Sequence, residues 1–107
     1  MIKERGMKLD DQKDRWDLLP IETVVDIVRV LMYGCKKYGP WNWMHVLEPR
    51  RRYYAATMRH LAAYASGEEI DEESGLPHLA HAATCLVFLL AAKRFTDQSE
   101  KEKEPDM

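Results

Sequence analysis

The hydrophobic residues of the chain fall into three stretches with helical spacing, separated by residues that end helices. The first stretch is expected to run from about 20 to 38, because Pro20 suits a first helical turn and Gly39-Pro40 stops the pattern. Its apolar positions recur three or four residues apart: Ile21, Val24, Val25, Val28, Leu31, Met32 and Cys35. This spacing predicts an amphipathic helix with one apolar side available for packing.

Two further helices are predicted in the second half of the chain. The pattern indicates one from Pro49 to Gly67, followed by an acidic run over 68–73. Ser74 is a candidate N-cap for a third helix that begins near 75. From 76 to 92 the chain has no Asp, Glu, Lys or Arg, which predicts a helix covered by protein on nearly every side.

These elements predict an all-α fold, a small bundle of three main helices that is completed by oligomerisation. A chain of 107 residues has room for one domain, which we expect over 1–95, with a charged and disordered tail over 96–107. A lone three-helix unit cannot shield a helix that is apolar all round. We therefore expect a homo-oligomer, either a dimer or a tetramer.

Charge and composition narrow the classes of partner. The chain is 46% hydrophobic and 32% charged, with a net charge of −2, so it is globular and has no field that attracts a nucleic-acid polymer. The apolar run over 76–92 is shorter than the roughly 20 residues of a membrane span and contains Pro77 and two histidines. The charged N-terminus does not suit a signal peptide, and Cys35 and Cys85 suit reduced core thiols, so a cytoplasmic location is expected.

The densest set of potential metal ligands lies around the start of the third helix. His78 and His81 are three residues apart and come one turn after the acidic run that contains Asp71 and Glu73. Imidazole with carboxylate suits Mn²⁺, Fe²⁺ or Zn²⁺, whereas the alternative is a pair of hydrogen-bonded core histidines. His60 on the second helix is a candidate partner or further ligand.

A second acidic pair lies on the first helix. Glu22 and Asp26 are four residues apart, so they project side by side and a divalent cation would relieve their repulsion. The alternative is a solvated face on which Asp26 pairs with Arg29.

Several cations and aromatics suit a nucleotide. A triphosphate needs several positive groups, and aromatic rings can stack on a base, although solubility and core packing are the alternatives. The candidates for these roles are the cations Lys13, Arg15, Lys36, Lys37, Arg50, Arg51 and Arg52 and the aromatic residues Tyr38, Trp41, Trp43 and Tyr53. The chain has no glycine-rich phosphate loop and no nucleophile elbow, so covalent catalysis is not indicated.

Several strings are specific in combination. They are Lys13-x-Arg15-Trp16-Asp17-Leu18-Leu19-Pro20, Gly34-x-x-Lys37-Tyr38-Gly39, Asn42-Trp43, Arg59-His60, and the segment Gly67-Glu68-x-x-Asp71-x-Glu73-Ser74-Gly75-Leu76-Pro77-His78-Leu79-Ala80-His81-Ala82. With them, residues 8 to 92 resemble the phage-type dATP/dGTP diphosphohydrolase N-terminal family. That family is similar to the MazG-like all-α nucleoside triphosphate pyrophosphatases.

The resemblance implies hydrolysis of a purine (deoxy)nucleoside triphosphate, dGTP or dATP, to the monophosphate and pyrophosphate with Mg²⁺ or Mn²⁺. In place of the acidic helix motifs of MazG-like enzymes, Glu22-x-x-x-Asp26 and His78-x-x-His81 are the nearest counterparts. Glu73 and Asp71 are expected to be catalytic. Expected metal ligands are Glu22, Asp26, His60, Asp71, Glu73, His78 and His81. Expected substrate contacts are Lys13, Arg15, Lys37, Tyr38, Asn42, Trp43 and Arg52.

Two other functions fit the same residues. One is a non-catalytic nucleotide-binding or regulatory helical oligomer, and the other is a His/carboxylate metal phosphohydrolase acting on another phosphoester. The sequence does not choose guanine over adenine, deoxyribose over ribose, or Mn²⁺ over Mg²⁺. If the chain is encoded by a phage, its expected location is the host cytoplasm.

Overall fold

The fold is all-α, as the sequence predicts. The structure is a computed structural model that describes the backbone of residues 6–103 and the side chains of residues 6–95. Its elements in chain order are η1 (Trp16–Leu18), α1 (Ile21–Tyr38), η2 (Asn42–His45), α2 (Pro49–Ala65) and α3 (His78–Lys103), where η marks a 3₁₀ helix. Within residues 6–103 the only β-type pairing is an isolated antiparallel bridge between Ile70 and Pro77.

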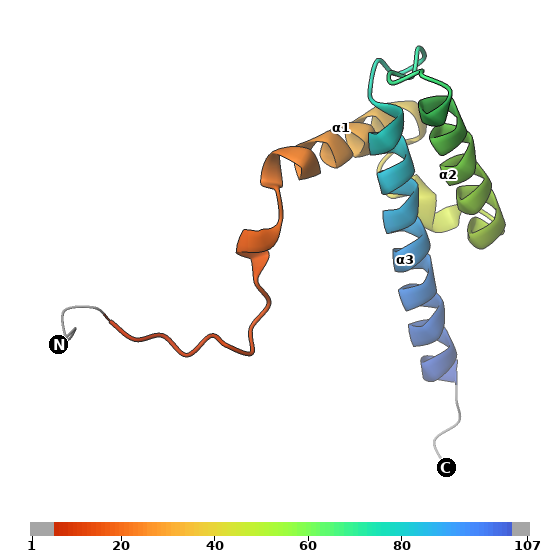
Figure 1. The fold of residues 1–107 in the computed structure, drawn as a ribbon. Helices are drawn as coiled ribbons and strands as arrows, with labels where there is room; N and C mark the ends of the chain where they lie inside the picture. Colours follow the sequence, from red (N-terminus) through yellow and green to blue (C-terminus); the bar gives the residue numbers. More distant parts are fainter. Residues whose placement is uncertain (1–5, 104–107) are drawn as a thin grey trace.

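The core lies between α2 and α3, which run side by side in opposite directions from the loop that joins them (Figure 1). The small side chains of Thr57 on α2 and of Ala80, Ala82 and Thr84 on α3 are buried between the helices, so the two backbones can approach closely. Both threonine hydroxyls donate to the carbonyl oxygen four residues earlier, at 2.7 Å. These bonds satisfy the hydroxyls and remove the penalty for burying them.

The helix α1 begins and ends where Pro20 and Gly39 predict. The C-terminal half of α1, where Val30 is buried, contacts α3. The N-terminal half of α1 extends away from α2 and α3 (Figure 1). Its apolar side does not pack on the rest of the chain: Ile21 and Met32 are 64% and 65% exposed. Within one chain, the packing expected for this side is therefore missing.

The helix α3 differs from the expectation at both ends. It begins at His78 rather than near 75, because residues 70–77 form a turn with its own hydrogen bonds. It continues past 92 to Lys103, through a segment rich in Glu, Lys and Gln, which favour helix. The expected tail over 96–107 is thus helical as far as 103, and 104–107 lie outside the described residues.

One side of α3 is open in the single chain. The side chains of Leu86 and Leu90 are 54% and 67% exposed, although the sequence predicted a helix covered on nearly every side. No helix in residues 6–103 is both long enough and apolar enough to cross a bilayer.

Candidate active site

The candidate site is built on the turn between α2 and α3. The Asp71 N–H donates to the Leu76 carbonyl at 2.9 Å, and the His78 N–H donates to the Glu69 carbonyl at 2.8 Å. Gly75 has a φ of +73°, a left-handed conformation that glycine adopts without strain. These contacts hold the acidic segment directly against the first turn of α3.

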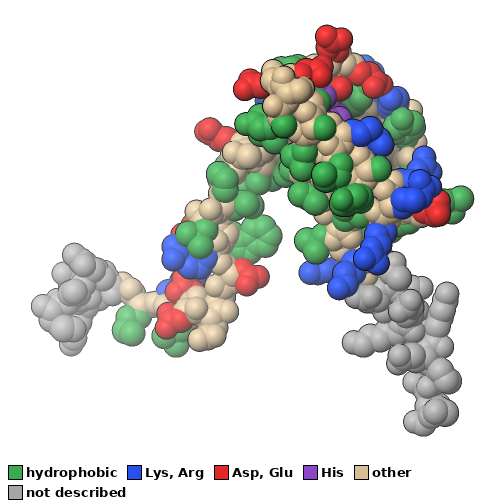
Figure 2. Space-filling view, turned by 45° about the vertical axis from the view of Figure 1, so that its right-hand side comes forward, with side chains coloured by type: hydrophobic (Ala, Val, Ile, Leu, Met, Phe, Trp, Pro, Cys, Tyr) green, Lys and Arg blue, Asp and Glu red, His purple; other side chains and the backbone are tan. Residues whose placement is uncertain are grey.

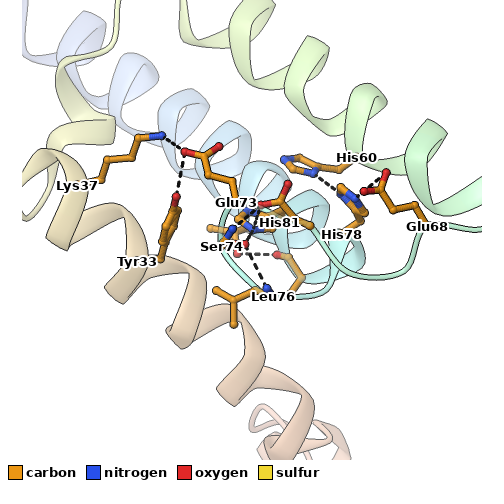
Figure 3. Close-up of polar contacts among 12 residues, drawn as sticks. Tyr33, Lys37, His60, Glu68, Glu73, Ser74, Leu76, His78 and His81 are labelled. Carbon is orange, nitrogen blue, oxygen red and sulfur yellow. Dashed lines mark hydrogen bonds and ion pairs between the residues drawn. The ribbon is translucent and has the colours of Figure 1, made fainter.

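Glu73 projects from this turn toward α1 (Figure 3). Its Oε1 accepts hydrogen bonds from Lys37 Nζ at 2.5 Å and from the Tyr33 hydroxyl at 3.0 Å. The Lys37 ammonium and then the Tyr33 hydroxyl hold the pKa of Glu73 below its ordinary value, and Glu73 in turn raises the pKa of Lys37. Glu73 is therefore a carboxylate at neutral pH.

Asp71 faces the inside of the same turn. Its Oδ2 accepts the backbone N–H of Ser74 at 3.0 Å and lies 3.7 Å from Nε2 of His81. Partial burial opposes ionisation, but hydrogen bonding by Ser74 and the nearby His81 bring the pKa of Asp71 below its ordinary value. Ser74 Oγ also lies 2.7 Å from His81 Nε2, so the serine links the turn to α3 rather than capping it.

Three histidines form one cluster behind the carboxylates. The rings of His60 and His81 stack with centroids 4.6 Å apart, and Nδ1 of His60 lies 2.9 Å from Nδ1 of His78. Burial, followed by the neighbouring imidazoles, lowers the pKa of His60. Burial also lowers the pKa of His81, although Asp71 opposes this effect. For His60 and His81, the neutral imidazole is therefore favoured at pH 7.

His78 is the most enclosed member of the histidine cluster. It is 5% exposed, and its Nε2 is buried without a hydrogen-bond partner. The nearest charged atom given for this nitrogen is Glu68 Oε2, at 3.5 Å. A buried imidazole nitrogen without a partner is unusual in native proteins, and Glu68 is placed to approach it.

A hollow of about 910 Å³ lies beside these groups. Of the residues expected at the site, those in its lining are Lys37, Tyr38, Asn42, Trp43, Arg52, His60, Asp71, Glu73 and His81. Arg51 and Arg59 also line it. Figure 2 shows acidic side chains at the top of the molecule, histidine atoms just below them, and a hydrophobic area beneath. The hollow thus joins carboxylates, cations and apolar surface, the three features that a nucleoside triphosphate needs.

The aromatic part of the lining comes from η2 and the helices beside it. Trp43 stacks on Phe88 of α3 with ring centroids 5.0 Å apart and planes at 14°, and Tyr53 lies 5.0 Å from the same phenylalanine. Trp41 lies 5.9 Å from Trp43. The aromatic residues of the loop before α2 are therefore partly engaged in packing, as the alternative interpretation of these rings holds.

The structure does not bring five of the expected metal ligands and substrate contacts to the lining of this hollow. One of them, His78, belongs to the histidine cluster but is absent from the described lining. Lys13 and Arg15 lie in the N-terminal segment that extends away from the helices, where Arg15 pairs with Asp17 (Figure 1). Glu22 and Asp26 lie on the N-terminal half of α1 and are absent from the described lining. Asp26 lies 4.0 Å from Arg29, which is the ion pair that the solvated-face alternative predicts.

The family model described as "dATP/dGTP diphosphohydrolase, N-terminal" matches residues 3–103. The chain belongs to this family. It is also 34% identical over 84 residues to a protein of Salmonella phage PMBT28 named "dATP/dGTP diphosphohydrolase". That match covers 78% of this chain but only 28% of the phage protein, so the chain spans under a third of its relative's length. No solved structure matches the chain.

The carboxylates of the candidate site bear on whether a divalent cation fits there. Among the described residues, no three His, Cys, Asp or Glu side chains converge as a metal site. Mg²⁺, however, is commonly held by one or two carboxylates together with substrate phosphates, and does not need an all-protein cage. Asp71 and Glu73 are ionised and line one hollow, so they supply that kind of partial site.

Sequence reasoning did not assign Tyr33 or Ser74 to the candidate site. Tyr33 binds Glu73, and Ser74 contacts both Asp71 and His81. A signal for Tyr33 existed, because it lies four residues before Lys37 and therefore on the same face of α1. Both residues contact Glu73, which is 36 or more residues away in the chain. These contacts depend on how α1 packs against the turn, which the sequence pattern does not show.

Proposed function

We propose that this chain hydrolyses purine deoxynucleoside triphosphates, dGTP or dATP, to the monophosphate and pyrophosphate in a reaction that depends on Mg²⁺ or Mn²⁺. The observation that carries the proposal is the hollow beside the α2–α3 turn, which joins two ionised carboxylates, neutral histidines, cations and aromatics in a member of this family. The phage relative's name supports the substrate class. The expected cytoplasmic location stays a prediction.

In the proposed reaction, a water oxygen bonds to the α phosphorus and the bond from that phosphorus to the α,β-bridging oxygen breaks. The products are the monophosphate and pyrophosphate, and the water loses its protons to solvent or a base. Asp71 and Glu73 would hold the cation, which supplies charge neutralisation and a more acidic water when bound. His81, neutral and next to Asp71, is the group that can accept a proton.

The cations of the lining would hold the phosphates. Lys37 is bound to Glu73 in the described structure, so it is available to phosphate only if it leaves that carboxylate. Arg52 and Arg59 come from α2 on the hollow's wall and have no ion pair given among the described residues. Arginine binds phosphate oxygens in a bidentate manner, which suits a triphosphate chain.

The experiment is product analysis with purified chain. dGTP, dATP and ribonucleotide controls are incubated with Mn²⁺, Mg²⁺ or EDTA, and the products are separated and identified. The proposal expects the deoxynucleoside monophosphate and pyrophosphate in equal amounts, and no turnover in EDTA. Diphosphate with free phosphate as the first products would contradict attack at the α phosphorus.

A second function has one specific observation in its favour. Both carboxylates are already bound by the protein's own donors, Glu73 by Lys37 and Asp71 by Ser74, which suits a nucleotide-binding or regulatory protein without chemistry. Binding of dGTP without conversion, at an enzyme concentration close to that of the nucleotide, would favour this alternative. Turnover of another phosphoester, but of no nucleotide, would favour the third function considered above.

A further inference from the structure

A single tyrosine connects α1 to both the acidic turn and the histidine cluster. The Tyr33 hydroxyl donates to Glu73 Oε1 at 3.0 Å, and its ring meets the His81 ring edge-on, with centroids 6.3 Å apart and planes at 88° (Figure 3). The Tyr33 phenol is thus a neutral donor that contacts both groups.

The same carboxylate oxygen has a second donor. Lys37 Nζ binds Glu73 Oε1 at 2.5 Å and lies 5.8 Å from the centre of the Tyr33 ring. An ammonium group at a carboxylate competes with a divalent cation for that carboxylate, because both are positive and repel each other. A phenol is neutral, so it can remain bound to a carboxylate that also faces a cation.

We propose that Tyr33 is a positioning residue: it holds the Glu73 carboxylate in place while Lys37 exchanges from Glu73 to the phosphates of the substrate. The proposal rests on the proposed function, because it takes Glu73 as a cation ligand and a triphosphate as the acceptor of Lys37. The two donors to Glu73 Oε1 thus have different roles. Lys37 balances the charge of Glu73 before the substrate binds, and Tyr33 fixes the geometry of the carboxylate.

The test measures Mn²⁺ binding by the full chain without nucleotide, from the electron paramagnetic resonance signal of free Mn²⁺. Tyr33→Phe removes only the hydroxyl, and Tyr64→Phe on α2, whose side chain is 43% exposed, is the matched control. Loss of a group that supports a metal ligand typically weakens affinity about 10- to 100-fold. We expect this loss in Tyr33→Phe and wild-type affinity in Tyr64→Phe.

Lys37→Met tests the exchange. It should bind Mn²⁺ at least as tightly as the wild type, because the competing ammonium is gone, and should raise KM for dGTP about tenfold or more. Tyr33→Phe should instead lower kcat with little change in KM. Weakened Mn²⁺ binding in Lys37→Met would contradict the exchange.

A double-mutant cycle decides whether Tyr33 acts through Glu73. If it does, Tyr33→Phe in a Glu73→Gln background should change Mn²⁺ affinity little, because the shared interaction is already lost. The assignment is wrong if Tyr33→Phe weakens Mn²⁺ binding as much in the Glu73→Gln background as in the wild type. It is also wrong if Tyr33→Phe keeps the wild-type Mn²⁺ affinity, or if the wild type binds no Mn²⁺. A wild type that binds Mn²⁺ but hydrolyses no nucleotide would contradict the proposed function alone, and the affinities would still decide the duty of Tyr33.

Discussion

The surroundings of Glu73 differ from those expected for a free surface acid. It carries two donors on one oxygen, and both lower its pKa, yet its side chain is 63% exposed. An ion pair with this exposure adds little to stability, on the order of 0–1 kcal/mol. These two donors therefore suit a carboxylate with a functional role better than one whose role is to stabilise the fold.

Glu73→Gln tests that task. The substitution keeps size and a hydrogen-bond acceptor but removes the charge, so we expect nearly unchanged melting and a fall in dGTP turnover of at least about 100-fold. Steady-state kinetics with saturating Mn²⁺ measure it. Glu72→Gln, one position earlier in the turn, is the matched control and should keep wild-type rates. Near-normal turnover in Glu73→Gln would move the site away from this turn.

The histidine cluster predicts a pH dependence of stability. The pKa values of His60 and His81 are lower in the folded chain than the ordinary value of about 6.5, so the unfolded chain binds more protons as pH falls through that region. The stabilisation is fully present above about pH 6.5 and is lost as pH falls below it toward the folded-state values. Protonation would also place like charges on stacked rings.

We expect the melting temperature in EDTA to fall between pH 7.5 and 5.5, above the range in which Asp71 and Glu73 titrate. A loss of 1 kcal/mol corresponds to about 4–8 °C in a domain of this size. His60→Gln should flatten the profile, because it removes one of the groups that must stay neutral. His45→Gln in η2, for which no contact with the cluster is given, is the control. An unchanged slope in His60→Gln would contradict this account.

At the scale of elements, the turn before α3 depends on Gly75. Its φ of +73° strains any residue with a Cβ, while the space around it is open, so backbone strain alone sets the effect of a substitution. Gly75→Ala should destabilise the chain by about 1 kcal/mol. The Gly75 N–H donates to the Asp71 carbonyl at 2.7 Å, so a change in the backbone at Gly75 should displace Asp71. Turnover should therefore also fall.

Gly34→Ala is the matched control with the opposite sign. Gly34 lies inside α1, has no positive φ and also has open space around its Cα, so alanine should stabilise the helix by about 0.5–1 kcal/mol. Urea denaturation of both variants measures the two free energies of unfolding. Equal effects in the two variants would show that the conformation of Gly75 does not constrain the turn.

The elements show which features could be predicted from the sequence. The bounds of α1 follow from Pro20 and Gly39, which act locally, and the start of α2 follows from Pro49 for the same reason. The start of α3 could not be predicted from helical periodicity alone. Ser74 is a good N-cap by composition, but the bridge between Ile70 and Pro77 keeps the chain non-helical until His78.

The contacts of the candidate site were predictable where the residues lie near one another in sequence. Asp71 and His81 lie ten residues apart across one turn and face each other as expected. The contact of Lys37 with Glu73 depends on how α1 packs against the turn, and the hydrophobic pattern along the chain does not predict that packing. Glu22 and Asp26 have a suitable spacing but lie on the half of α1 that extends away from the site (Figure 1).

At the scale of the whole molecule, the single chain leaves a large apolar surface exposed to solvent. The apolar side of α1 and the outer side of α3 both carry large exposed residues: Ile21, Val25, Val28, Leu31, Met32, Leu86, Val87 and Leu90. Contiguous apolar areas of this kind on a single chain indicate a surface that another protein covers. The charge of −2 spread over a small protein does not oppose self-association strongly.

We therefore expect a homo-oligomer, a dimer or a tetramer, at micromolar concentration. Light scattering coupled to size-exclusion chromatography gives the mass, to be compared with 12.5 kDa for one chain. Val28→Glu with Met32→Glu places two charges on the apolar side of α1 and should lower that mass or unfold the chain, because a buried unpaired charge is very unfavourable. Lys36→Gln with Lys93→Gln, on exposed polar positions of α1 and α3, lowers the chain charge by the same amount and should leave the mass unchanged. A wild-type mass of one chain, with the fold intact by circular dichroism, would mean that these apolar sides stay open to water or await a different partner.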